Sequence, residues 1–172
     1  MRNMIKFGMF AAGTLIAAPA FAQTGTDTAT GSTTIVRPVT ITKDADLAFG
    51  KIVRPPSGTS AVSMTDASDT VSADNGGLAV GTGTSRAKFT INGEGAQVVT
   101  LTVPANFVMT RSGGAETLTV TLDPDLGATT TLSSTLGTAG TKALNIGGSF
   151  SVLSTTVTGL YSGTFDVSVA YQ

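Results

Sequence analysis

Carboxylates and hydroxyls are the side chains left for metal or hydrolytic chemistry in this sequence, because its 172 residues include no His and no Cys. The acids include an Asp-x-Asp pair, Asp44 and Asp46, and a second pair, Asp123 and Asp125, around Pro124. Hard cations bind oxygen ligands, but neither pair has the spacing and closing Glu of a calcium loop. Acids beside Gly, Pro or Asn are typical of turns. We therefore assign no metal ligand, and weak calcium binding by these loop acids is the alternative left open.

Catalytic motifs are also missing. A Ser nucleophile needs a base, and the sequence offers neither His nor an S-x-x-K motif. Gly81-Thr82-Gly83 matches only the start of a dinucleotide-binding fingerprint, because Arg86 stands where the third Gly belongs. Carboxylate spacing along the sequence cannot show the separation that glycoside hydrolysis needs. The sequence predicts no catalytic residue and no cofactor, and we expect that the chain is not an enzyme.

The first 22 residues have the pattern of a secretory signal peptide. Arg2 and Lys6 give a basic start, an apolar run spans residues 7–18, and Ala20-Phe21-Ala22 forms an A-x-A cleavage site. We expect residues 1–22 to direct export to the periplasm of a Gram-negative bacterium, and from there to the cell surface or the extracellular medium.

The chain that would follow cleavage has little that attracts nucleic acid or spans a membrane. It keeps 8 basic and 11 acidic residues, a net charge of −3, which does not favour binding to phosphate backbones. It contains no second apolar run approaching 18 residues, so we expect no membrane span in the mature chain.

Short runs with apolar residues at every second position begin at Ile35, after a polar segment at residues 23–34 that we expect to be a flexible leader. Thr occupies many of the intervening positions, and the sequence has 31 Thr, 15 Ser and 21 Gly. A branched residue with a hydroxyl suits the outer face of a half-buried antiparallel strand. The clearest runs are Val39 and Ile41; Phe89 and Ile91; Val99, Leu101 and Val103; Leu118, Val120 and Leu122; and Phe165, Val167, Val169 and Tyr171.

Turn residues separate these runs. We expect turns at Asp74–Gly77, Asn92-Gly93 and Ser112–Gly114, and a bulge or a change of sheet at Gly147-Gly148. Such spacing favours an all-β fold with one domain at residues 35–172, a single antiparallel β-sandwich.

The last 14 residues resemble the carboxyl-terminal signature of chaperone-usher pilins. Tyr171 is penultimate, Gly159 is fourteenth from the end, and Phe165, Val167 and Val169 alternate between them. The resemblance implies an immunoglobulin-like, pilin-like sandwich whose last strand pairs with a periplasmic chaperone and is later completed by the leader of the next subunit. Its partners would be copies of itself and a periplasmic chaperone and usher.

Residues 35–172 also resemble an uncharacterised family of secreted bacterial domains, "domain of unknown function" number 4402. The likeness lies in Ile41-Thr42-Lys43, the segment Asp46 to Val53, a turn at Phe89 to Gly93, and the ending Tyr161 to Phe165. It implies a fold and export more than an activity.

The sequence departs from many pilins, because it has no disulfide and its leader alternates Thr with Gly, Ala and Asp, which offers no large apolar side chain for a neighbour's groove. The donor could instead be the segment with Ile35, Val39 and Ile41, where Pro38 would cost one ladder hydrogen bond. The alternative is that Phe165 to Tyr171 is the last strand of a complete sandwich, with the Tyr171 hydroxyl reaching solvent.

Two functions follow as expectations. The first is a structural subunit of a fimbria-like surface assembly, joined by β-strand complementation. The second is a self-contained secreted binding module that recognises a glycan or a surface protein through its loops, with Gly76 to Gly83 and Arg111 to Gly114 as candidates.

Overall fold

The structure is a computed structural model that describes residues 24–172. The predicted signal peptide, residues 1–22, lies outside the described residues. The chain divides into two units, Met1–Thr34 and Ile35–Gln172. Residues 24–34 of the first unit are exposed and contain no helix or strand. Every regular element of the second unit is a β-strand, so the prediction of an all-β fold is confirmed.

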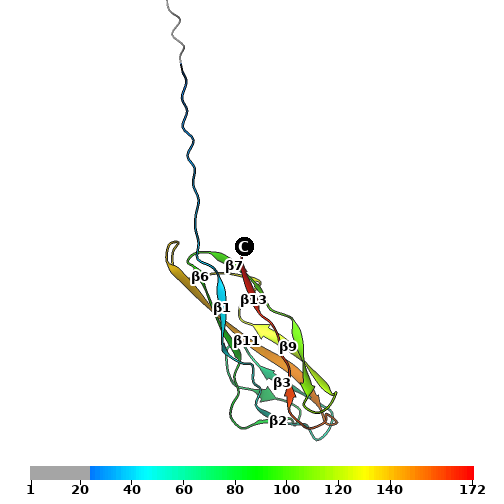
Figure 1. The fold of residues 1–172 in the computed structure, drawn as a ribbon. Helices are drawn as coiled ribbons and strands as arrows, with labels where there is room; N and C mark the ends of the chain where they lie inside the picture. The colour runs from blue at the N-terminus through cyan, green and yellow to red at the C-terminus, as the bar shows by residue number, and fades with distance from the viewer. Residues whose placement is uncertain (1–23) are drawn as a thin grey trace, which may run out of the picture. The chain divides into compact units, whose positions relative to one another are not determined.

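The second unit contains one large antiparallel sheet, one three-stranded antiparallel sheet and a two-stranded ribbon (Figure 1). The large sheet has the order β1 (Thr40–Ala45), β6 (Ala87–Glu94), β11 (Ala139–Leu153), β9 (Thr117–Pro124), β8 (Asn106–Arg111), β12 (Tyr161–Ser162), with β3 (Thr59–Met64) beside β11 and β4 (Ser72–Ala73) beside β3. The small sheet is β10 (Thr129–Thr131), β7 (Val98–Thr102), β13 (Ser168–Tyr171), and the ribbon is β2 (Lys51–Val53) with β5 (Leu78–Val80).

β11 is 15 residues long and organises the large sheet (Figure 1). Along one edge it pairs first with β6, up to Ile146, and then with β3, from Gly148 onward, while its other edge pairs with β9. The predicted bulge or change of sheet at Gly147-Gly148 is wrong, because the strand continues in register with β9 through both residues. Glycine is needed because a Cβ at Gly147 would collide with the carbonyl oxygen of Met64.

The chain passes between the large sheet and the small sheet several times. β8 and β7 are consecutive, as are β9 and β10, and β12 and β13, and each pair has one strand in each sheet. The Leu122 amide donates to the Ala105 carbonyl at 2.9 Å, and the Leu101 amide donates to the Ala128 carbonyl at 2.7 Å. These bonds continue the pairing of neighbouring chain segments where they pass from one sheet to the other. The two sheets form a sandwich-like arrangement.

One apolar core lies between the sheets, and the period-two pattern accounts for it. In β9, Val120 and Leu122 are buried while the intervening Thr residues are exposed, which confirms the predicted inward and outward faces. The small sheet adds Val99 and Leu101 from β7. The buried apolar residues are Phe49, Val62, Met64, Ala87, Ile91, Val99, Leu101, Val120, Leu122, Leu132, Leu144, Ile146, Phe150 and Val152.

The predicted turns have different outcomes. The Asp74–Gly77 turn is confirmed: the Gly77 amide donates to the Asp74 carbonyl at 2.8 Å. The Asn92-Gly93 turn is wrong, because both residues lie inside β6 and pair with β11. Gly93 serves packing there, since a Cβ on it would lie 2.5 Å from the Tyr171 hydroxyl.

Candidate assembly site

The last strand and the first strand of the domain lie side by side without pairing, and we call the boundary between them the terminal seam. β13 pairs with β7 on one side, and β1 pairs with β6 on one side. β1 and β13 approach each other (Figure 1), but within residues 24–172 no ladder of hydrogen bonds joins them. Both strands therefore present an edge to the terminal seam, and an unpaired edge is a template for strand addition.

The register of β13 shows which of its backbone groups face the seam. The Gln172 amide donates to the Val98 carbonyl, and the Leu101 amide is directed to β10 instead. Because hydrogen-bonded and non-bonded pairs alternate along an antiparallel ladder, Ala170 bonds to β7 while Val169 and Tyr171 direct their N–H and C=O groups to the opposite side. Val169 and Tyr171 thus supply the backbone donors and acceptors of the free edge.

One end of the terminal seam is closed by four residues that we call the clasp: Arg37, Glu94, Gly137 and Tyr171. The Tyr171 hydroxyl donates to the Arg37 carbonyl at 2.7 Å and accepts from the Glu94 amide at 2.7 Å. The hydroxyl that was expected to reach solvent in a complete sandwich is thus bonded to two main-chain groups of the domain. The clasp joins the start of the domain, the end of β6 and the last strand.

Glu94 is the buried charge of the clasp, with a side chain only 3% exposed. Its carboxylate accepts hydrogen bonds from the Arg37 guanidinium at 2.9 Å, from the Arg37 amide at 3.3 Å and from the Gly137 amide. Burial raises the pKa of Glu94, but the two amides and the Arg37 charge outweigh it, so this pKa lies below its ordinary value. The clasp therefore holds Glu94 in its ionised form.

The other end of the terminal seam opens into an apolar cavity of about 480 Å³. Its walls come from the chain that follows β1 and from the chain that precedes β13. Four side chains of the large sheet also line it: Met109, Leu118, Phe150 and Val152. Leu160, which is 71% exposed, and Val157 also line it and are accessible to solvent. This end of the core is therefore not filled by the domain's own side chains.

Of the predicted assembly residues, Val169 and Tyr171 lie in β13 at the terminal seam. Val167 and Val169 are half-buried against the core, and Phe165 packs on Phe107 with ring centroids 5.0 Å apart. The predicted strand is too long at its start, because β13 begins at Ser168 and the preceding residues cross between the sheets. Gly159 has φ of +152° and lies against the Arg111 side chain, a combination that favours glycine.

The predicted donor residues separate into two groups. Val39 and Ile41 are half-buried against their own core, and Ile41 pairs with Ile91. A donor role for them would require β1 to leave its own sheet. Ile35 is 89% exposed, and Val36, which the sequence reasoning missed, is 39% exposed.

The family model described as "Domain of unknown function (DUF4402)" matches residues 39–171. The chain belongs to this family. No curated protein and no solved structure matches the chain. The DUF4402 match runs from Val39 to Tyr171, so it contains both edges of the terminal seam and leaves Ile35 and Val36 outside.

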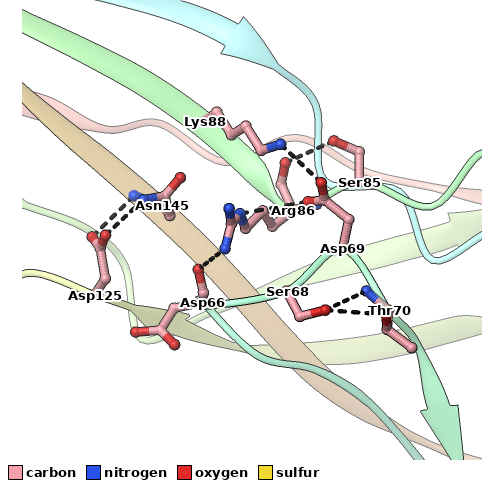
Figure 2. Close-up of polar contacts among 9 residues, drawn as sticks. All are labelled: Asp66, Ser68, Asp69, Thr70, Ser85, Arg86, Lys88, Asp125 and Asn145. Atoms are coloured by element: carbon pink, nitrogen blue, oxygen red, sulfur yellow. Dashed lines mark hydrogen bonds and ion pairs between the residues drawn. The ribbon is translucent and has the colours of Figure 1, made fainter.

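The acids of the DUF4402 domain bind loops to strands. Figure 2 shows the Asp69 carboxylate between Lys88, at 2.9 Å, and the backbone amide of Arg86, at 3.1 Å. The hydrogen bond from Lys88 and then that from the Arg86 amide hold the pKa of Asp69 below its ordinary value. The Arg86 guanidinium also donates to the Asp66 carbonyl at 2.6 Å. This cluster fixes the loop before β4 to the start of β6.

A second acid in Figure 2 has a similar structural partner. Asp125 accepts from the Asn145 amide at 2.9 Å and from its side chain at 2.7 Å. Asp44 accepts from the Thr90 hydroxyl at 2.7 Å, and Asp46 pairs with Lys43. Across the described residues, no group of three acidic side chains is placed to hold a metal ion, and no helix is long and apolar enough to cross a membrane.

The candidate binding loops are also internally bonded. Arg111 donates to Glu116 at 2.7 Å, and this bond raises the pKa of Arg111 and lowers that of Glu116. The Gly114 amide donates to the Arg111 carbonyl, which closes the turn between β8 and β9. The other candidate, Gly76 to Gly83, is not a single loop, because Leu78–Val80 form β5. Gly76, Gly81 and Gly83 on either side of this strand have positive φ, which fits backbone turns.

Proposed function

We propose that this DUF4402 domain is a structural subunit of a fimbria-like surface assembly and that its copies are joined by β-strand complementation. The observation that carries the proposal is the free edge of β13, where Val169 and Tyr171 direct unpaired backbone groups to the terminal seam, whose other end opens into an apolar cavity. An incoming strand would supply backbone hydrogen bonds to this edge and apolar side chains to the seam. No catalytic step is part of this role.

The pilin-like ending supports the same proposal. Penultimate Tyr171 and half-buried Val169 lie in β13 at the terminal seam, half-buried Val167 directly precedes this strand, and Gly159 lines the cavity. In this proposal, residues 1–22 export the chain to the periplasm of a Gram-negative bacterium, a chaperone and usher handle the free edge, and the subunit then reaches the cell surface.

The loop-binding alternative has less support. The Arg111 guanidinium, the basic side chain of its candidate loop, is held by Glu116. The loops Gly76 to Gly83 and Arg111 to Gly114 contain no aromatic residue that could stack on a sugar.

Electrophoresis of the exported product tests the proposal. The full chain is expressed in a Gram-negative host, and the periplasmic and surface fractions are run on a denaturing gel with and without boiling. Strand-complemented polymers should persist as a ladder that collapses on boiling. A single monomer band before boiling, together with a cooperative melt of that monomer, would overturn the proposal.

A further inference from the structure

Apolar surface is exposed at two opposite ends of the domain. At the clasp end, Ile35 and Val36 stand just before Arg37. At the other end lies the cavity. β11 connects the two ends, because its first residue, Ala139, pairs with Glu94 and its late residues Phe150 and Val152 line the cavity (Figure 1). At about 3.3 Å per residue, these ends are roughly 40 Å apart along the strand.

Ile35 cannot fill the cavity of its own copy. Arg37 is fixed at the clasp end through its backbone carbonyl, its amide and its guanidinium. Ile35 is two residues away, and two extended residues span only about 7 Å. Any Ile35 that reaches a cavity must therefore come from a second copy.

The size and chemistry of the two surfaces fit each other. Ligand pockets of roughly 300–1,000 Å³ enclose small organic ligands, so a cavity of about 480 Å³ suits a few side chains rather than a long strand. The cavity is lined mainly by apolar residues. The leader before Ile35 has no large apolar side chain, so Ile35 and Val36 are the first apolar anchors after the predicted cleavage site. Their burial in a partner would remove exposed apolar area at both ends.

We infer that Ile35 and Val36 of one copy insert into the cavity of the next copy, beside Phe150 and Val152. This inference rests on the proposed function, since it names the anchor residues and the receiving pocket of the same assembly. The contact joins two different surfaces, so each copy keeps one free donor end and one free cavity. Repeating it gives an open linear polymer rather than a closed dimer.

Cross-linking between two single-Cys variants tests the contact directly, because the full chain has no native Cys. Full-length Ile35→Cys and Leu160→Cys chains with different tags are mixed and oxidised. Leu160 is at the cavity and 71% exposed, so its replacement should not disturb folding. The mixed disulfide should form readily. The matched control is Val98→Cys, an exposed position on β7 that does not line the cavity, and it should give at most background cross-linking with Ile35→Cys.

A second pair of variants measures the contribution of the anchor. Full-length Ile35→Ser should weaken self-association at least about tenfold, whereas Leu136→Ser, at another exposed position, should leave it unchanged. If the chain forms heat-sensitive polymers but Ile35→Cys cross-links Leu160→Cys no better than Val98→Cys, the docking inference is overturned and the proposed function stands. If the chain is monomeric at every concentration, both are overturned.

Discussion

The Tyr171 hydroxyl donates a hydrogen bond to the Arg37 carbonyl at 2.7 Å across a sequence separation of 134 residues. The same hydroxyl accepts from the Glu94 amide. One phenol therefore holds the end of the chain against the start of the domain, and it closes the terminal seam at one end while the cavity leaves the other end open.

Replacement of Tyr171 by Phe tests the clasp. Tyr171→Phe removes the acceptor of the Glu94 amide and the donor to the Arg37 carbonyl. An amide left without a partner in a partly buried site costs about 1–3 kcal/mol of unfolding free energy, so the urea midpoint should fall accordingly. The control is Tyr161→Phe, whose hydroxyl donates to the exposed Val157 carbonyl. Equal midpoints for Tyr171→Phe and the unmodified chain would contradict the clasp.

Glu94 should make the domain sensitive to acid. Its pKa in the folded state lies below the ordinary value of 4.5, so its ionisation stabilises the fold above about pH 4.5. That stabilisation is lost as the pH falls through the lower folded-state pKa. Glu94→Gln should be less stable than the unmodified chain at neutral pH. Its stability should also fall less when the pH is lowered. The urea midpoint of each chain, measured between about pH 3 and pH 6, gives this pH dependence of stability. The control Asp46→Asn removes an exposed carboxylate, and its stability should fall in acid as much as that of the unmodified chain. An equally large fall for Glu94→Gln would contradict the prediction.

Gly147 should tolerate no side chain. Gly147→Ala would push a Cβ into the backbone at Met64 to Asp66, where β11 exchanges one partner strand for the next. We expect a loss of at least about 3 kcal/mol in unfolding free energy. Gly127→Ala is the matched control, because nothing lies within 4 Å of its Cβ position and its φ is not positive. It should change stability by less than about 1 kcal/mol, and similar losses for the two variants would contradict the packing described for β11.

Gly93 should control the position of Tyr171. A Cβ at Gly93 would lie 2.5 Å from the Tyr171 hydroxyl and 2.8 Å from Leu132. Gly93→Ala should therefore displace the phenol and lower stability at least as much as Tyr171→Phe. In the double variant the two effects should be less than additive, because both act on the same contact. Full additivity in urea unfolding would show that Gly93 and Tyr171 act independently.

The sequence predicted the elements whose signals are local. The apolar residues of β9 alternate with Thr from Thr117 to Leu122, so its inner and outer faces could be assigned. The Asn92-Gly93 signal failed because pairing with β11 and the approach of Tyr171 outweigh a two-residue turn preference. The clasp could not be predicted, since Tyr171 and Glu94 bind main-chain groups that composition does not reveal. The cavity could not be predicted either, because segments that are far apart in the sequence line it. Val36 was missed because it does not belong to a period-two run of apolar residues.

The central claim is that a strand from another subunit pairs with the free edge of β13, and amide hydrogen exchange measures this pairing most directly. Exchange is compared between assembled full-length material and the monomer obtained from it by boiling and refolding. The Val169 and Tyr171 amides, which face the seam, should become strongly protected on assembly, while the Ala170 amide, which bonds to β7, should be protected in both forms. Equal exchange of the Val169 and Tyr171 amides in assembled and monomeric protein would contradict strand complementation at this edge.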